Sequence, residues 1–531
     1  MRVCVKYMNM FKLTFLVCCI LATQSVSDAY KILVVFPMPG KSHSILGYSV
    51  VKHLLKAGHE VTYVTPFVED NHHPNLTQVD VSSNMRLIPK GGLDLKRVLD
   101  KEVNVIDNGF MFYFMKQIQE ATLEHEQVKK LLEDPNKTFD IVIVEWMYCE
   151  LGASYAAVFD VPLIWLSTME PHWLVTRLID GNLNPAYNGD SMSSSIPPFT
   201  FLQRVKELWI QIHTSFILLN DDQERSYDRL VRPLIEKKGR KAPSFEDLKF
   251  NASLVLGNSH VSLGEATGTP QSYKPIAGYH IEEVVKPLPA DLKEIMENAK
   301  HGVIYFSMGS NLKSTEMPDE MKQNLVKMFG ELKQTIIWKF EEDFPNLPKN
   351  VHIVNWAPQP SILSHPNCVL FITHGGLLST TESVHFGVPI VGIPVFGDQF
   401  INVQRAVKRG FAKKVDFSYS MVGELKVAIQ EILSDSSYRT RIKELSLIYH
   451  DRPVSPGAEL VHWVEHVART RGALHLRSPA LHVPFYQKLY LDLLAVVLII
   501  SLIFYRKICL IKNLLLSFFQ TNEIKKKKKR N

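Results

Sequence analysis

The chain has 531 residues, of which 46% are hydrophobic and 21% charged, so it can bury a large core in two or three domains. This composition excludes a disordered chain, and only six cysteines exclude a disulfide scaffold. The net charge of +6 lies at the ends: residues 506–531 carry +8 and residues 1–29 carry +2, which leaves the body at −4. A body of this charge does not favour nucleic acid as a partner, and we expect none.

The first residues predict a secretory signal peptide over 1–29. Arg2, Lys6 and Lys12 precede a short apolar run at 13–22, and small residues follow. An N-terminal membrane anchor is the alternative, but the run is short for a bilayer span.

The first half of the body repeats a strand–helix–strand pattern that is typical of a parallel sheet with helices on both faces. We expect a Rossmann-like α/β domain over residues 30–265, followed by a Gly- and Pro-containing linker at 266–300. The expected strands are 31–37, 61–66, 139–145, 161–167 and 253–259, the last of which closes the domain, and the clearest helices are 44–56 and 149–159.

The second half predicts another Rossmann-like domain over residues 301–475. The expected strands are 302–310, 335–340, 351–356, 368–373 and 389–396, with helices at 318–332 and 379–386 and covering helices near 422–471. Two such domains that face each other form a cleft lined by the carboxyl ends of strands, where α/β sheets bind ligands.

Near the C-terminus, residues 489–505 form an apolar segment of the minimum length for a transmembrane helix, and a basic tail follows at 506–531. The positive-inside rule puts the tail in the cytosol and the body across the membrane, a type I arrangement. Three N-glycosylation sequons in the body agree with a lumenal location, at Asn75, Asn136 and Asn251. Lys528 and Lys529 resemble a dilysine signal for the endoplasmic reticulum, and a plain stop-transfer cluster is the alternative.

The chemistry-bearing residues concentrate between 371 and 399, in the segment FITHGGLLSTTESVHFGVPIVGIPVFGDQ. A buried strand leads through His374 and two glycines into a helix, whose free N–H groups form an anion site. Glu382 lies two helical turns further on, and a later strand brings Asp398 and Gln399 to the same sheet edge. This composition suits a diphosphate, a ribose diol and a sugar with several hydroxyl groups.

The segment resembles the signature of the UDP-glycosyltransferase family: His-Gly-Gly, Glu eight residues after the His, two prolines around a strand, and Asp-Gln. Trp356–Gln359 matches the family's W-x-P-Q, and FSMGS at 306–310 matches its domain-opening strand. The whole layout resembles the microsomal membrane-bound branch, and PMPGKSH and ALHVPFYQKLYLDLLAVV resemble insect members. The resemblance implies the GT-B type of fold, with two Rossmann-like domains that face a cleft and one C-terminal transmembrane helix.

The resemblance also implies a set of donor-binding residues. Uracil would contact Trp356 and Gln359, the phosphates Ser310, His374, Gly376 and Ser379, the ribose Glu382, and the sugar Asp398 and Gln399. Many relatives have Asn four residues after the signature His, whereas this chain has Leu378, so one polar contact is either absent or supplied by backbone.

The family's catalytic histidine falls on His43, in the segment PMPGKSH after the first strand. A histidine with a near-neutral pKa suits the base that deprotonates the acceptor during inverting transfer. Relatives place an Asp at the end of the fourth strand as its partner, and this chain has Glu145 there. Either Glu145 takes that role or the partner lies elsewhere, for instance at Glu150. An apolar acceptor pocket could involve 110–114, Met147, Tyr148 and Trp173, although such runs are more often ordinary core.

These features predict a membrane-anchored UDP-glycosyltransferase of the endoplasmic reticulum that transfers a hexose to small lipophilic hydroxyl compounds, as in detoxification. Glucose is favoured over glucuronate, and we expect no metal and no cofactor besides the UDP-sugar co-substrate. The alternatives are a non-catalytic binding protein of the same fold and a sugar-nucleotide epimerase. The sequence leaves a homo-oligomer open.

Overall fold

The computed structural model describes residues 29–529, apart from 71, 89–94, 103–106, 181–183, 220–221, 311 and 313. The predicted signal peptide therefore lies outside the described residues, except for Ala29. The chain forms two compact units, Met1–Arg477 and Ser478–Asn531.

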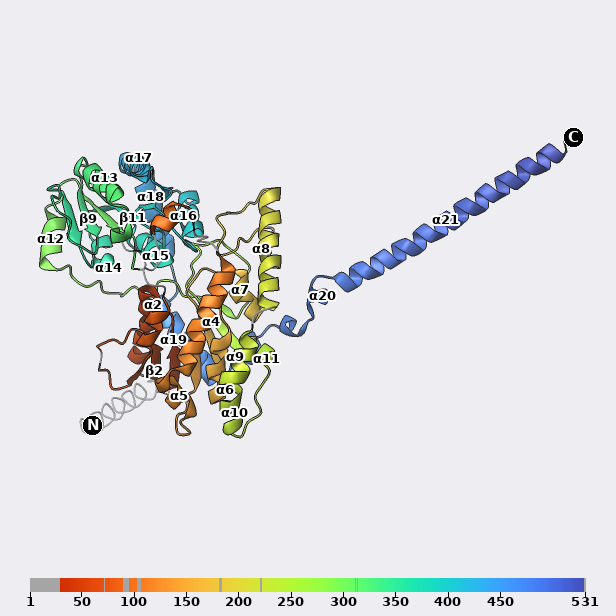
Figure 1. Ribbon diagram of the computed structural model, residues 1–531, viewed down its shortest axis with the longest axis horizontal. Helices are drawn as coiled ribbons and strands as arrows, with labels where there is room; N and C mark the ends of the chain where they lie inside the picture. Colours follow the sequence, from red (N-terminus) through yellow and green to blue (C-terminus); the bar gives the residue numbers. More distant parts are fainter. Residues whose placement is uncertain are drawn as a thin grey trace, which may run out of the picture. The chain divides into compact units, whose positions relative to one another are not determined.

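The first unit contains two parallel sheets (Figure 1). The seven-stranded sheet has the order β3-β2-β1-β4-β5-β6-β7, and the six-stranded sheet has the order β10-β9-β8-β11-β12-β13. The strands are β1 Lys31–Val35, β2 Glu60–Thr65, β3 Leu76–Asp80, β4 Ile141–Trp146, β5 Leu163–Ser167, β6 Ala252–Gly257, β7 Tyr273–Pro275, β8 Val303–Ser307, β9 Thr335–Lys339, β10 Val351–Val354, β11 Cys368–Thr373, β12 Ile390–Gly392 and β13 Ala412–Lys414.

The central strands, such as β1, β5, β8 and β11, are mainly apolar along their length because both faces of each sheet are covered. In β1, Ile32 and Val34 belong to the core on one face, whereas Leu33 and Val35 belong to the core on the other. Successive strand residues point to opposite faces, so this division follows directly from the pattern KILVV. The predicted α/β class with two Rossmann-like domains is confirmed.

Helices of the first unit cover both sheets. In chain order the helices are α2 Lys41–Lys56, α3 Leu95–Leu99, α4 Asn108–Glu124, α5 Glu126–Glu133, α6 Ser154–Phe159, α7 Trp173–Thr176, α8 Phe201–Leu219, α9 Gln223–Leu230, α10 Arg232–Lys237, α11 Phe245–Lys249, α12 Ala290–Glu297, α13 Asp319–Gly330, α14 Gln359–Leu363, α15 Leu377–Phe386, α16 Gln399–Lys408, α17 Met421–Ser434, α18 Ser436–His450, α19 Pro456–Arg469, α20 Phe485–Lys488 and α21 Leu491–Lys528. Of these, α20 and α21 belong to the second unit.

The first domain includes two segments from outside its predicted range 30–265, which the sequence prediction missed. Strand β7, at Tyr273–Pro275, pairs with β6, so the first sheet extends into the predicted linker 266–300 and β6 does not close it. Helix α19 lies within the range predicted for the second domain, but its residues Leu460 and Val464 pack into the core of the first. The prediction assigned both by chain continuity, whereas burial of their apolar faces decides where they lie.

Two element boundaries also differ from the predictions. Helix α2 begins at Lys41, so His43 lies in its first turn and not in a loop. Strand β12 ends at Gly392, well before the predicted residue 396. The chain turns toward α16 after Gly392, and Pro394 has no N–H with which to continue a strand.

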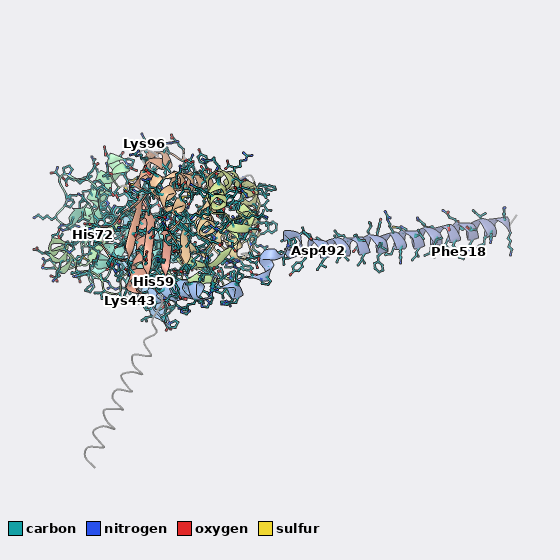
Figure 2. The ribbon with its side chains drawn as sticks, turned by 90° about the horizontal axis from the view of Figure 1, so that it is seen from below. His59, His72, Lys96, Lys443, Asp492 and Phe518 are labelled. Carbon is teal, nitrogen blue, oxygen red and sulfur yellow. The ribbon has the colours of Figure 1, made fainter. Side chains whose placement is uncertain are left out.

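The second unit consists mainly of α21, a continuous helix of 38 residues that begins at Leu491. Figure 2 shows its side chains pointing outward on all sides between Asp492 and Phe518. Its part Leu491–Lys526 is long and apolar enough to cross a membrane by length and composition. The helix continues beyond the predicted limits 489–505, because residues 508–519 are also mainly apolar and no Gly or Pro interrupts them.

Candidate active site

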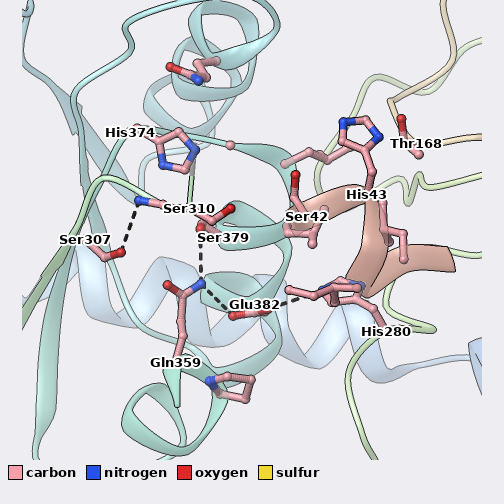
Figure 3. A pocket seen from close by; sticks show the side chains of 18 of the residues that line it. Ser42, His43, Thr168, His280, Ser307, Ser310, Gln359, His374, Ser379 and Glu382 are labelled. Carbon is pink, nitrogen blue, oxygen red and sulfur yellow. Dashed lines mark hydrogen bonds and ion pairs between the residues drawn. The ribbon is translucent and has the colours of Figure 1, made fainter. Parts of the chain in front are cut away.

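Both sheets reverse their strand order at one point, and polar residues gather there. The reversal lies between β1 and β4 in the first sheet and between β8 and β11 in the second. Chain segments leave neighbouring strands in opposite directions at such a point, which opens a crevice at the carboxyl ends of the strands. A cavity of about 350 Å³ is lined by residues from both domains at this position, including His43 and Met147 from the first and His374 and Asp398 from the second (Figure 3).

His43 and Glu145 are in direct contact on the first-domain side of the cavity. The Nδ1 atom of His43 is hydrogen-bonded to Oε1 of Glu145. Glu145 follows Val144, which pairs with Val35 at the end of β1, so sheet register brings the two residues together. The Glu145 side chain is fully buried, whereas His43 is 13% exposed and lines the cavity. With Nδ1 engaged, Nε2 is the nitrogen that can take a proton from a ligand.

The surroundings of His43 adjust its basicity. Burial alone lowers the pKa of an imidazole, but attraction and hydrogen bonding to Glu145, together with attraction to Asp398, outweigh it. The pKa of His43 therefore lies above its ordinary value of 6.5. Because Asp398 belongs to the second domain, the field at His43 depends on both sides of the cavity.

Glu150, the alternative partner for His43, is engaged elsewhere. Its Oε1 atom accepts a hydrogen bond of 2.7 Å from Nη2 of Arg177, and its Oε2 accepts one of 3.1 Å from Gln223. Of the two carboxylates, Glu145 is the one that contacts His43.

On the second-domain side, His374 sits between two glycines. A Cβ atom at Gly309 would lie 2.5 Å from Cε1 of His374, and one at Gly376 would lie 2.6 Å from Nε2. Neither position leaves room for a side chain while the imidazole keeps its place. Gly375 adopts φ +81°, a left-handed conformation that favours glycine, and lets the chain turn from β11 into α15.

The start of α15 and His374 both offer hydrogen-bond donors to an anion. The first N–H groups of a helix have no partner within it, and no acidic side chain occupies the first turn of α15. Burial, with a smaller contribution from Lys339, lowers the pKa of His374 to about 4. The imidazole is therefore neutral at physiological pH and can donate one N–H.

Glu382 is held by residues on both of its oxygens. Gln359 Nε2 donates to Oε2 of Glu382 at 2.8 Å and to Oγ of Ser379 at 3.2 Å. His280 Nε2 lies 3.5 Å from Oε1 of Glu382 (Figure 3). All four residues line the cavity, so a carboxylate that can accept two hydroxyl groups is fixed in orientation.

Asp398 and Gln399 lie at the start of α16. Asp398 accepts a hydrogen bond of 3.0 Å from Asn402, and burial raises the pKa of its carboxyl. The Gln399 oxygen accepts bonds from the backbone N–H groups of Val395 and Phe396, at 2.9 and 3.1 Å. The Gln399 NH₂ group therefore remains for a ligand, beside an acceptor at Asp398.

The structure brings together all the predicted donor-binding residues. The lining of the cavity includes Ser310, Trp356, Gln359, His374, Gly376, Ser379, Glu382, Asp398 and Gln399. Trp356 is 59% exposed, which leaves a ring face for a planar ligand. Their individual roles stay predictions.

Sequence reasoning missed Lys339 and His280. Lys339 is a lysine of the cavity wall, and its Nζ donates to the Gly309 carbonyl and to Glu341, both at 2.9 Å. A lysine at the end of the otherwise apolar strand TIIWK was a signal that could have indicated it. His280 stands alone in the predicted linker 266–300, and no motif around it indicated a site residue.

Of the residues considered for an acceptor pocket, Met147 lines the cavity, whereas Tyr148 and Trp173 belong to the core, the alternative already noted for such runs. Phe110 is 53% exposed on the surface and Tyr148 is fully buried. The Trp173 indole donates to Asp190 at 2.8 Å within the core. The cavity wall also contains Leu378, which packs against the apolar core of the first domain, so this residue provides interdomain packing in place of a polar contact.

The sequons and body cysteines lie in different environments. Asn136 and Asn251 are exposed and Asn75 is half-buried, and their glycosylation stays a prediction. Cys149 and Cys368 are buried thiols.

Two Rossmann-like domains with a shared cavity at the reversal points of their sheets define a fold of the GT-B type. Solved structures agree: the glycotransferase of kitacinnamycin has a TM-score of 0.54 at 18% identity and covers 83% of this chain and 98% of its own. The calicheamicin glycosyltransferase CalG4 has a TM-score of 0.53 at 18% identity, over 83% of this chain and 99% of its own. At this identity the likeness shows the fold alone.

Comparison of amino-acid sequences identifies the family, which the structural likeness does not. The family model described as UDP-glucoronosyl and UDP-glucosyl transferase matches residues 31–529. UDP-glucosyltransferase 2 of Dactylopius coccus is 32% identical over 483 residues, covering 90% of this chain and 91% of the relative. UDP-glucuronosyltransferase 2B15 of Rattus norvegicus is 27% identical over 493 residues, covering 88% of this chain and 89% of the relative. The chain belongs to the UDP-glucoronosyl and UDP-glucosyl transferase family and is a UDP-glycosyltransferase.

Proposed function

We propose that this enzyme transfers glucose from UDP-glucose to hydroxyl groups of small lipophilic acceptors, with inversion at the anomeric carbon. The observation that carries the proposal is the contact between His43 and Glu145 at the wall of a cavity whose opposite wall holds the predicted donor residues. A base on one side and a donor site on the other are what a single displacement needs.

The proposed reaction makes one bond and breaks one. The acceptor oxygen attacks the anomeric carbon from the face opposite the diphosphate, and the bond from that carbon to the β-phosphate oxygen breaks. Nε2 of His43 takes the acceptor proton, while Glu145 stabilises the imidazolium that forms. UDP leaves with its negative charge facing His374 and the start of α15.

Glucose is favoured over glucuronate by the charges in the cavity. The lysine in its wall, Lys339, is already bonded to Glu341, so its charge is paired. Asp398 can accept hydrogen bonds from sugar hydroxyls but would repel a second carboxylate. The name of the Dactylopius coccus relative, a glucosyltransferase, supports the same choice, and glucuronate remains the second candidate.

We also propose that α21 anchors the enzyme in the endoplasmic reticulum membrane, with the body lumenal and the basic tail cytosolic. The apolar stretch Leu491–Lys526 supports the anchor, and the lysines at 525–529 support the orientation. Lipophilic acceptors concentrate in the bilayer, so an anchored enzyme would lie close to its substrates.

The test is the release of UDP by membranes that contain the full chain, with UDP-glucose or UDP-glucuronate and a panel of phenols. We expect acceptor-dependent release that is faster with UDP-glucose and unchanged by EDTA. Faster release with UDP-glucuronate would overturn the choice of sugar. Binding of UDP-sugar without release would support the non-catalytic alternative, and a new UDP-sugar formed without acceptor would support an epimerase.

A further inference from the structure

Helix α8 has its polar side buried and its apolar side exposed. Of its 19 residues, only Glu207 and Thr214 are buried. Glu207 accepts a hydrogen bond of 2.9 Å from the Asp190 N–H and another from the Ser193 hydroxyl, while Thr214 accepts one of 3.4 Å from Asn108. These polar contacts, together with partial packing of Ile217 and Leu218 on the core, hold the helix to the first domain. Most of its other apolar side chains are exposed, which is the reverse of an ordinary surface helix.

The exposed side forms a continuous apolar stripe, here called the α8 apolar face. Its residues are 40–69% exposed and recur at helical spacing: Phe201, Val205, Leu208, Trp209, Ile212 and Phe216. A helix of 19 residues is about 28 Å long, so the stripe runs the length of a small domain. In Figure 1, α8 lies along the edge of the body. A continuous exposed stripe of this kind marks an interaction surface.

Helix α4 widens this surface. Tyr113 of α4 is 62% exposed and lines a shallow groove together with Phe216 of α8. Phe110, one helical turn before Tyr113, is also exposed. The apolar area is therefore shared by two neighbouring helices.

We propose that the α8 apolar face lies on the surface of a phospholipid membrane, with its side chains among the headgroups and upper acyl chains. The exposed charged side chains of α8 are Arg204 and Lys206, both positive, and their long side chains can reach lipid phosphate groups beside the apolar stripe. Trp209 presents a large amphipathic ring, which suits the interface between water and lipid.

The inference rests on the proposed anchoring by α21. This anchoring is also a second argument for contact between α8 and the membrane. Only residues 478–490 connect the first unit to α21, and 13 residues span at most about 45 Å even when fully extended. The body of an anchored chain therefore stays close to the bilayer, which favours contact between α8 and the membrane surface.

The test uses the full chain in phosphatidylcholine and phosphatidylserine vesicles. Cysteines outside the buried body are replaced by serine, and an environment-sensitive fluorophore is attached through Leu208→Cys. We expect a blue-shifted emission and quenching by nitroxides placed about 5–10 Å below the headgroup boundary.

Val427→Cys on α17 is the matched control, because Val427 is also an exposed apolar residue, and its label should stay in water. Adding Trp209→Glu and Phe216→Glu should return the label at 208 to water, while UDP release in detergent shows that the fold is intact.

The outcomes separate this inference from the proposal on which it rests. Chains that float with the vesicles but keep the label at position 208 in water would overturn the docking of α8. A blue shift without lipid quenching, together with energy transfer between labelled copies, would overturn it in favour of a contact between two copies of this chain. Chains that fail to float would overturn the anchoring itself.

Discussion

The contact between His43 and Glu145 places a base of raised pKa at the wall of the cavity. The carboxylate contributes in two ways, because it fixes the imidazole through Nδ1 and stabilises its charged form. A base must be unprotonated to act, so the raised pKa of His43 sets the lower pH limit of activity.

Replacing Glu145 by Gln should shift the acid limb of the pH profile of kcat/KM to lower pH. Without the carboxylate, burial again dominates and the pKa of His43 falls. The plateau should also fall, by about ten- to a thousandfold, because the imidazolium loses its partner in the transition state. The measurement is kcat/KM for the UDP-sugar between pH 5 and 9 at saturating acceptor.

Glu150→Gln is the matched control, since it removes a buried carboxylate that pairs with Arg177 and not with His43. Its acid limb should coincide with that of the unmodified enzyme. An unchanged limb in Glu145→Gln, or an equal shift in both variants, would contradict the role of Glu145.

The sequence predicted residues whose position follows from local motifs and missed those placed by long-range packing. Glu145 lies near the carboxyl end of β4, and His43 and most donor residues come soon after the ends of strands, which a parallel sheet brings to one edge. His280 reaches Glu382 from a segment without regular pattern, and no local spacing could have paired them. The contact with Glu145 rather than Glu150 likewise depends on the register between β1 and β4.

The turn between β11 and α15 depends on glycines, because a side chain at these positions would collide with His374. Gly309 follows β8 rather than β11, yet its missing side chain is the space that His374 fills. Two strands of the sheet are therefore coupled through one imidazole at the proposed phosphate site.

Gly309→Ala should displace His374 and raise the KM for the UDP-sugar about tenfold or more, the loss expected for one hydrogen bond to a charged group. The substitution also strains the backbone, because residue 309 adopts φ +81°. Gly239→Ala is the control: it has φ +74° but no atom within 4 Å of the new Cβ, so it carries only the strain of roughly 1–2 kcal/mol. Equal KM values in the two variants would show that His374 does not hold the donor.

Strands and helices with strong periodicity could be predicted, while their assignment to a domain could not. Both parallel sheets follow from apolar runs such as KILVV and CVLFIT. Short β7 and helix α19 were assigned wrongly because local pattern shows that a face is apolar but not which core buries it. The second domain's boundaries thus depend on tertiary packing.

The two domains meet beside the active site through α16. This helix begins with the proposed sugar contacts, and near its other end Arg409 donates to the Leu263 carbonyl at 3.1 Å. Glu170, from the segment after β5, is buried at the same junction, and burial raises its pKa to about 7, although Arg405 and Arg409 oppose the shift. A carboxyl that is about half protonated at neutral pH therefore lies where the domains are joined.

Glu170 should make the folded state less stable as pH rises from about 4.5 to about 7. In this range the unfolded chain has lost the proton while the folded chain keeps it, so stability falls with pH. Glu170→Gln should remove this slope, so that the variant gains stability relative to the unmodified enzyme toward pH 7. Glu170→Asp keeps a carboxyl and should retain the slope. Thermal unfolding midpoints at pH 5, 6, 7 and 8 provide the comparison, and parallel curves for Glu170→Gln and the unmodified enzyme would contradict the assignment.

The measurement that tests catalysis at this cavity most directly is acceptor-dependent UDP release by His43→Ala. We expect a fall of at least about a hundredfold, with UDP-sugar binding unchanged, because the substitution removes the base and leaves the donor wall intact. His72→Ala is the control, since His72 is 97% exposed. Release by His43→Ala at the rate of the control would contradict the account and place the base at another residue.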